Sequence, residues 1–197
     1  MGSKTLTLAA LLCCLGLWGC KARYLAGDEV GLKQRRELIE QVEELRAAQA
    51  SCLAEAKGSL DDLEAEELED GPEVAGRIRA SLGEILRSVE QLEESSDRIY
   101  ARWDAAIAKA EPEVLAEKAR ERRGQTLERQ QQLLLKVEEA TLAIDLLLAE
   151  LEGRAADGAT PLLTAELRDR GVRGKALLEA SMDEADEFIA AERRKSR

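Results

Sequence analysis

The sequence predicts an all-α fold, an elongated antiparallel up-down bundle of about four long helices with coiled-coil packing. Two observations lead to this prediction. Aromatic residues make up 3% of the 197 residues and charged residues 35%, and only three prolines interrupt the chain. Such a composition, rich in Ala, Leu, Glu and Arg, is typical of long helices. Apolar residues also recur at alternating spacings of three and four, which is the a/d pattern of coiled coils.

The helical bundle is expected to occupy residues 28–192. Its helices are predicted at about 28–70, 73–110, 112–152 and 161–192, followed by a basic tail at 193–197. Asp28 is suited to cap the first helix, and Asp70-Gly71-Pro72 is the clearest stop signal. Short links between long helices place successive helices antiparallel, which predicts the up-down order.

Three of the helices carry an apolar seam. The expected seam residues are Leu38, Val42, Leu45, Gln49, Cys52, Ala56, Leu60 and Leu63 in the first helix; Ile78, Leu82, Ile85, Val89, Leu92, Ser96, Ile99, Trp103, Ala106 and Ala110 in the second; and Leu127, Gln130, Leu134, Val137, Thr141, Ile144, Leu148 and Leu151 in the third. Leu133, Ala140 and Leu147 widen the third seam beyond the stripe of a two-stranded rod, which favours a bundle.

Two positions leave alternatives open. Glu111-Pro112 marks either a turn or a kink, since proline cannot donate to a helix. A turn is the preferred interpretation because it gives the flanking helices matching lengths. Gly171 and Gly174 either weaken the first half of the fourth helix or let a neighbouring helix approach closely.

The first twenty residues have the pattern of a secretory signal. Lys4 supplies a positive charge, an apolar run follows from Leu6 to Leu17, and the small Gly19 precedes Cys20. The apolar run is about a dozen residues long, whereas a helix that spans a bilayer needs about 20. We therefore expect a signal and not a permanent membrane span.

The four residues Leu-Trp-Gly-Cys that end this segment resemble the bacterial lipobox, in which the final Cys receives lipid. The resemblance implies cleavage between Gly19 and Cys20, removal of 1–19 as a lipoprotein signal peptide, and a diacylglycerol thioether on Cys20. Residues 20–27 then form a lipid-anchored tether. Lys21, where Asp would indicate inner-membrane retention, favours the outer membrane. An uncleaved signal anchor in the inner membrane is the alternative.

The net charge and the cysteines limit the classes of binding partner that the sequence favours. The net charge of −11 disfavours nucleic acid and disfavours lying flat on anionic lipid, so attachment is expected through the lipid, with the body standing off the membrane. Cys13 and Cys14 leave with the signal, so Cys52 is a lone thiol. The preferred interpretation buries it as a small apolar residue. The alternative is an interchain contact through Cys52 and Gln49, although Gln49 is better explained as a polar residue that sets helix register.

Three blocks of residues carry a family resemblance. They are Tyr24, Glu29 and Gly31 with Arg35-Arg36, Gln41-Val42-Glu43-Glu44, Arg46 and Gln49; then Trp103; then Met182 with Glu184-Ala185-Asp186 and Phe188-Ile189. They resemble an uncharacterised family of bacterial envelope lipoproteins, a helical coiled-coil domain of unknown function. The resemblance implies an envelope address and a helical fold, and it supplies no catalytic residue.

The chemistry of the chain favours a protein that acts by contact. There is no histidine, which removes the commonest general base and metal ligand. Runs of carboxylates on long helices are usually solvated faces. We therefore expect no enzyme, no cofactor and no metal, but a periplasm-facing spacer, scaffold or adaptor with an envelope partner or self-association. The alternative is a ligand-binding or enzymatic envelope component with a carboxylate-lined cleft.

Overall fold

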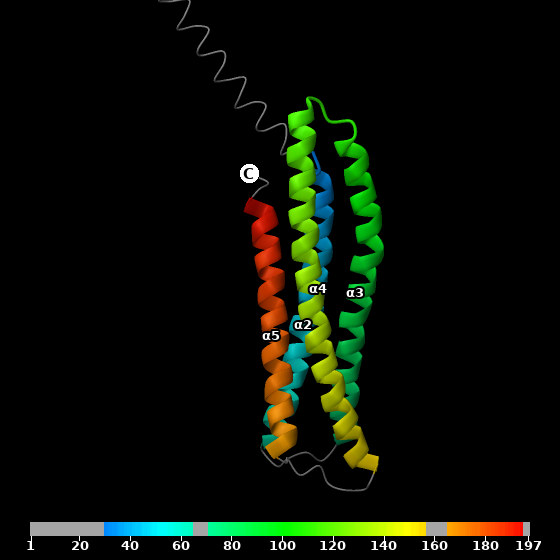
Figure 1. The fold of residues 1–197 in the computed structure, drawn as a ribbon. Coiled ribbons are helices and arrows are strands. Elements are labelled where there is room, and N and C mark those ends of the chain that lie inside the picture. The colour runs from blue at the N-terminus through cyan, green and yellow to red at the C-terminus, as the bar shows by residue number, and fades with distance from the viewer. Residues whose placement is uncertain (1–29, 65–70, 157–164, 195–197) are drawn as a thin grey trace, which may run out of the picture.

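The computed structural model describes residues 30–64, 71–156 and 165–194, and they form four long helices (Figure 1). The helices are α2 (Leu32–Glu64), α3 (Gly71–Ile107), α4 (Glu113–Ala156) and α5 (Ala165–Arg194). The described residues contain no strand, so the predicted all-α fold is confirmed. The expected signal peptide, the expected tether and the expected cap Asp28 lie outside the described residues. None of the described helices is long and apolar enough to cross a membrane.

The four helices form a closed ring. Each helix packs against the one before and the one after it in the chain, and α5 packs against α2. Successive helices run in opposite directions, as predicted (Figure 1). The start of α2, the α3–α4 turn and the end of α5 therefore lie together. We call this the upper end, as drawn in Figure 1, and the opposite one the lower end.

The helix boundaries settle one alternative and differ by a few residues from the expected limits. α3 stops at Ile107 and α4 begins at Glu113, so Pro112 marks a turn and not a kink. The Glu111–Pro112 peptide is cis. α2 is entered through Gly31, whose carbonyl accepts the N–H of Arg35 at 2.9 Å. α5 continues through Arg194, two residues beyond its expected end, so the first two residues assigned to the tail complete the last helical turn.

The seams predicted for the first two helices form the core. Every described seam residue of α2 is buried, and in α3 only Val89, Ala106 and Ala110 are partly exposed. In α4 the buried face is rotated from the expected seam. Leu133 and Ala140 are fully buried, whereas Leu134 and Thr141 are partly exposed. Five of the eight expected seam residues are nevertheless buried, so packing against α3 and α5 buries most of the expected seam together with the residues predicted to widen it.

The seam of α5 contains the two glycines. Its buried residues are Leu167, Gly171, Gly174, Leu178, Ser181, Ala185, Phe188 and Glu192, spaced by alternating fours and threes. A Cβ on Gly174 would lie 2.9 Å from Cδ1 of Ile144 and 3.9 Å from the carbonyl carbon of Ala143. The glycine therefore lets α5 approach α4 closely, which is the second of the two explanations open from the sequence.

Aromatic side chains fill the upper end of the core. Tyr100 and Trp103 stack with ring centroids 6.2 Å apart and planes inclined by 6°. The guanidinium of Arg123 lies 4.9 Å above the Tyr100 ring. Trp103 is fully buried and covers Gly31, where a Cβ would fall 2.1 Å from its Nε1. The rings thus fix how the chain enters α2.

Candidate functional site on helix α4

Helix α4 exposes a row of large apolar side chains on the face opposite the core. Leu135 and Leu142 are each 60% exposed, and Leu146 is 51% exposed. Their spacings of seven and four residues place them on one helix face. We call these three residues the leucine stripe. Exposed apolar residues are common singly, but a row on one helix is typical of an interaction surface.

The stripe follows from runs of leucine that are too wide for one buried face. Residues 133–135 and 146–148 are each three consecutive leucines. At 100° per residue, such a run spans about 200°, while the face of a helix that meets a core spans little more than 100°. Leu133, Leu147 and Leu148 are buried, so one leucine of each run must point away. This signal was present in the sequence, and sequence analysis missed it.

Two shallow grooves flank the stripe. The groove between α3 and α4 is lined mainly by apolar side chains, among them Leu86, Leu134 and Leu135, with Glu93 and Glu138 also in its wall. Leu86 is itself 53% exposed, which widens the apolar surface onto α3. The groove between α4 and α5 continues past Leu142 and Leu146.

The charges beside the stripe differ on its two sides: Glu93 and Glu138 line the groove toward α3, whereas Arg170 and Arg173 line the groove toward α5 together with Glu139. Between residues 131 and 149, the exposed charged side chains of α4 are Lys136, Glu138, Glu139 and Asp145. Lys136 is paired with Glu139 at 3.2 Å, so its charge is offset within the helix. A binding partner for this surface would therefore need an apolar face with positive charge on the side that meets α3.

Four site residues are predicted from the sequence, and the stripe contains none of them. Gly19 and Cys20 lie outside the described residues. Cys52 and Gln49 are both fully buried, and Gln49 Nε2 donates to Ser181 Oγ at 2.9 Å. Burial raises the pKa of the Cys52 thiol to about 11. In this fold neither side chain reaches the surface, so an interchain contact through them stays a prediction that requires the bundle to open.

A second polar group in the core links α3 to α4. Gln130 Nε2 donates to Ser96 Oγ at 2.6 Å, and the Tyr100 hydroxyl donates to Gln130 Oε1 at 2.9 Å. Buried, directional bonds of this kind favour one helix register over its neighbours. Gln49 and Gln130 therefore make hydrogen bonds inside the bundle, at the seam positions where the sequence places them.

The described carboxylates do not form a metal-binding cluster. In the part of the chain that the structure describes, no three acidic or cysteine side chains lie close enough to hold a metal ion. A groove between α2 and α3 contains Glu37 and Glu40, but Arg98 and Arg102 line it too. Arg102 pairs with Glu37 there. Negative charge in this groove is therefore largely balanced.

Comparisons with protein-family models, with curated proteins and with solved structures gave no match to this chain.

Proposed function

We propose that this protein is a lipid-anchored adaptor of the bacterial cell envelope that binds a partner helix through the leucine stripe of α4. The lipobox-like segment ending in Cys20 supports the anchor, and the character of the family that the chain resembles agrees with it. Lys21 supports the outer membrane, with the bundle facing the periplasm. The protein works by contact and catalyses no reaction.

The leucine stripe is the observation that carries the contact function. A helix that lies in a groove is held by apolar residues at helical spacing, and the stripe with its flanking grooves offers a matching surface. The acidic side chains on its α3 side favour a partner helix with basic residues on the flank that meets α3. A second copy of the chain fits less well, because it would bring Glu138 and Asp145 against the same acidic residues.

The contact can be tested by photo-crosslinking in intact cells. A photoreactive amino acid at residue 142 should crosslink to a helix that carries an apolar stripe with one basic flank, whereas the same group at exposed Asp97 should not. Leu135→Gln with Leu146→Gln should abolish the crosslink and leave the melting temperature unchanged, since both side chains are exposed. Val114→Gln with Val172→Gln, at exposed valines outside the stripe, is the matched control. A crosslink that survives loss of the stripe would refute the proposal.

The anchor is tested by the mass of the N-terminal peptide from protein extracted from native membranes. A peptide that begins at Cys20 and carries acyl chains supports the lipoprotein assignment. A peptide that still contains residues 1–19 contradicts it and supports an uncleaved signal anchor or a protein that is not exported.

The rival function is ligand binding in the α2–α3 groove, where Glu37 and Glu40 supply carboxylates. A ligand that binds only the folded protein raises its melting temperature by mass action. A screen of envelope metabolites that raises the melting temperature of the wild-type protein, but not of Glu40→Gln, would favour this rival over the adaptor.

A further inference from the structure

The two ends of the bundle carry opposite charge, although the whole chain is acidic with a net charge of −11. The upper end, taken as residues 30–37, 101–123 and 188–194, has eleven basic and seven acidic side chains. The lower end, taken as the described side chains of residues 52–58, 73–85, 143–153 and 166–173, has six basic and eight acidic ones. The molecule is therefore electrically polar along its long axis.

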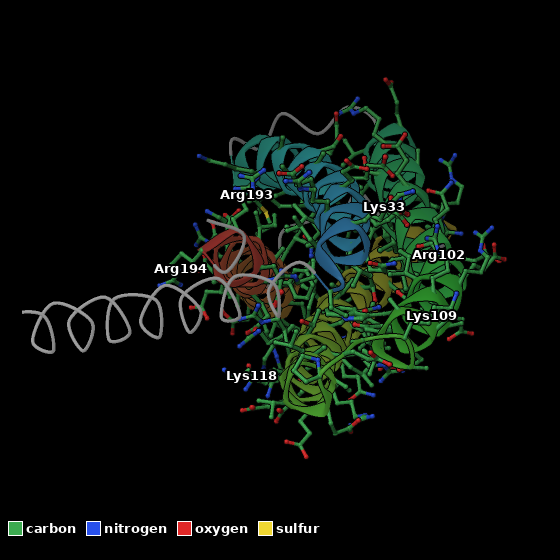
Figure 2. All side chains as sticks on the ribbon, turned by 90° about the horizontal axis from the view of Figure 1, so that it is seen from above. Lys33, Arg102, Lys109, Lys118, Arg193 and Arg194 are labelled. Atoms are coloured by element: carbon green, nitrogen blue, oxygen red, sulfur yellow. The ribbon has the colours of Figure 1, made fainter. Side chains whose placement is uncertain are left out.

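Basic side chains surround the upper end. Figure 2, seen from above, shows six basic residues around the rim of this end: Lys33 of α2, Arg102 of α3, Lys109 in the turn after α3, Lys118 of α4, and Arg193 and Arg194 of α5. Lys33, Arg36 and Lys109 are exposed and have no ion-pair partner among the described residues. No carboxylate of the described residues pairs with these three charges, so they can attract an external anion.

The position of this end in the chain indicates which anion it meets. Twelve residue steps separate Cys20 from Leu32 in the sequence, and an extended chain of that length reaches at most about 43 Å. If Cys20 is lipidated, the upper end is held within this reach of the membrane, while the lower end can lie up to a further helix length away. α3 has 37 residues, which corresponds to about 55 Å.

We propose that the upper end docks on the anionic headgroups of the membrane, so that the bundle stands upright on its tether. This inference rests on the lipid anchor of the proposed function. Basic residues near an anionic surface are attracted to it within about 10 Å at 0.1 M salt. The acidic lower end is repelled by the same surface. Attraction at one end and repulsion at the other orient the molecule, which a tether alone does not.

The orientation can be measured with the full protein reconstituted in lipid vesicles. A fluorescent amino acid is placed at Ala108, exposed in the upper turn, or at Gly76, exposed on α3 at the lower end. The vesicles carry a quencher on a zwitterionic headgroup and are made with or without 30% phosphatidylglycerol. Quenching at residue 108 should at least double with the anionic lipid and return to the zwitterionic level in 1 M salt. Residue 76 should be unaffected.

A triple variant, Lys33→Gln, Arg36→Gln and Lys109→Gln, tests the residues that carry the proposal. Each charge removed should weaken docking about fivefold, so the extra quenching at residue 108 should disappear. The control removes three exposed cations elsewhere, Lys57→Gln, Arg87→Gln and Arg173→Gln, and should leave quenching unchanged. Quenching that is the same with both lipids, or equally lost in both variants, would overturn the proposal.

Failure of the anchor is separable from failure of docking. A lipidated protein sediments with zwitterionic vesicles, so its absence from them would contradict the anchor alone. Docking is then read from anionic vesicles, where quenching that needs the three cations supports it and its absence refutes it.

Discussion

At the scale of single residues, Gly31 is the position with the least tolerance for change. Its φ of 87° is rarely adopted by residues with a side chain, and Trp103 occupies the space that a Cβ would need. The buried Trp103 cannot move aside without disturbing its stack on Tyr100. A single missing Cβ thus controls the entry of the chain into the bundle.

Gly31→Ala should destabilise the protein by about 3 kcal/mol, combining the strain of a left-handed alanine with displacement of a core indole. Gly124→Ala is the matched control, because that helical glycine faces open space. The control should gain about 0.5–1 kcal/mol from helix propensity. Urea unfolding followed by circular dichroism measures both. Equal effects would contradict the described packing of Trp103.

The two buried glutamines should respond differently to Leu. Gln130→Leu removes the acceptor of the Tyr100 hydroxyl and should cost about 2 kcal/mol. Gln49→Leu should change stability by less than about 0.5 kcal/mol, because Gln49 Oε1 has no hydrogen-bond partner and Ser181 keeps its bond to the Leu178 carbonyl. Adding Tyr100→Phe to Gln130→Leu should restore most of the loss. Chemical denaturation distinguishes these outcomes.

At the scale of helices, most of the fold could be predicted from the sequence, and the face of α4 could not. The seams of α2 and α3 each offer one apolar row, so their buried faces follow from periodicity. On α4, leucines stand at neighbouring positions, and the choice between Leu133 and Leu134 depends on the helices that surround them. The individual leucines of the stripe could not be identified for the same reason, because which leucines of α4 are exposed depends on which face of the helix packs against its neighbours.

A charged pair joins the first helix to the last. Arg46 on α2 donates to Asp186 on α5 through Nε at 2.6 Å and through its terminal nitrogen at 2.9 Å. These hydrogen bonds hold the pKa of Asp186 below its ordinary value. A carboxyl whose pKa is lower in the folded protein contributes stability above its unfolded pKa of about 3.9, and this contribution is lost as the pH falls through the folded pKa.

Asp186→Asn should therefore cost about 0.5–1 kcal/mol at pH 7, the value expected for a well-aligned exposed pair. The difference from wild type should shrink as the pH falls below about 4, where the Asp186 carboxyl of the unfolded protein begins to take up a proton, and it should vanish once the pH has fallen through the lower folded pKa. Asp97→Asn is the control, since Asp97 is exposed and has no described ion pair. Urea titrations between pH 2.5 and 7 measure the profile. A cost that does not vary with pH would show that the pair contributes nothing.

At the scale of the whole molecule, Cys52 reports on opening of the bundle. It lies in the core cluster to which all four helices contribute, and its raised pKa keeps it in the unreactive thiol form at neutral pH. Reaction with an alkylating reagent thus requires the helices to separate. The same burial keeps two copies of the chain from pairing through this residue while folded.

Alkylation of the Cys52 peptide, followed by mass spectrometry, should be at least a thousandfold slower in the native protein than in urea. Gly31→Ala should accelerate the alkylation by the same factor by which it raises the equilibrium constant for unfolding. A cysteine introduced by Leu142→Cys, on the exposed stripe, should react at an ordinary rate and serves as the control. Rapid native labelling of Cys52 would mean that the bundle opens readily.

The contact between α2 and α5 has a consequence for how the protein is made. It joins residues far apart in the chain, such as Gln49 and Ser181, which are 132 positions apart. Such contacts form late, because the intervening chain must first be ordered. Until α5 has been synthesised, the parts of the α2 and α4 seams that pack against it remain exposed to solvent. The growing chain is therefore prone to aggregation until its last helix has folded. Early termination within α5 should therefore be far more damaging to yield than any single substitution on the surface.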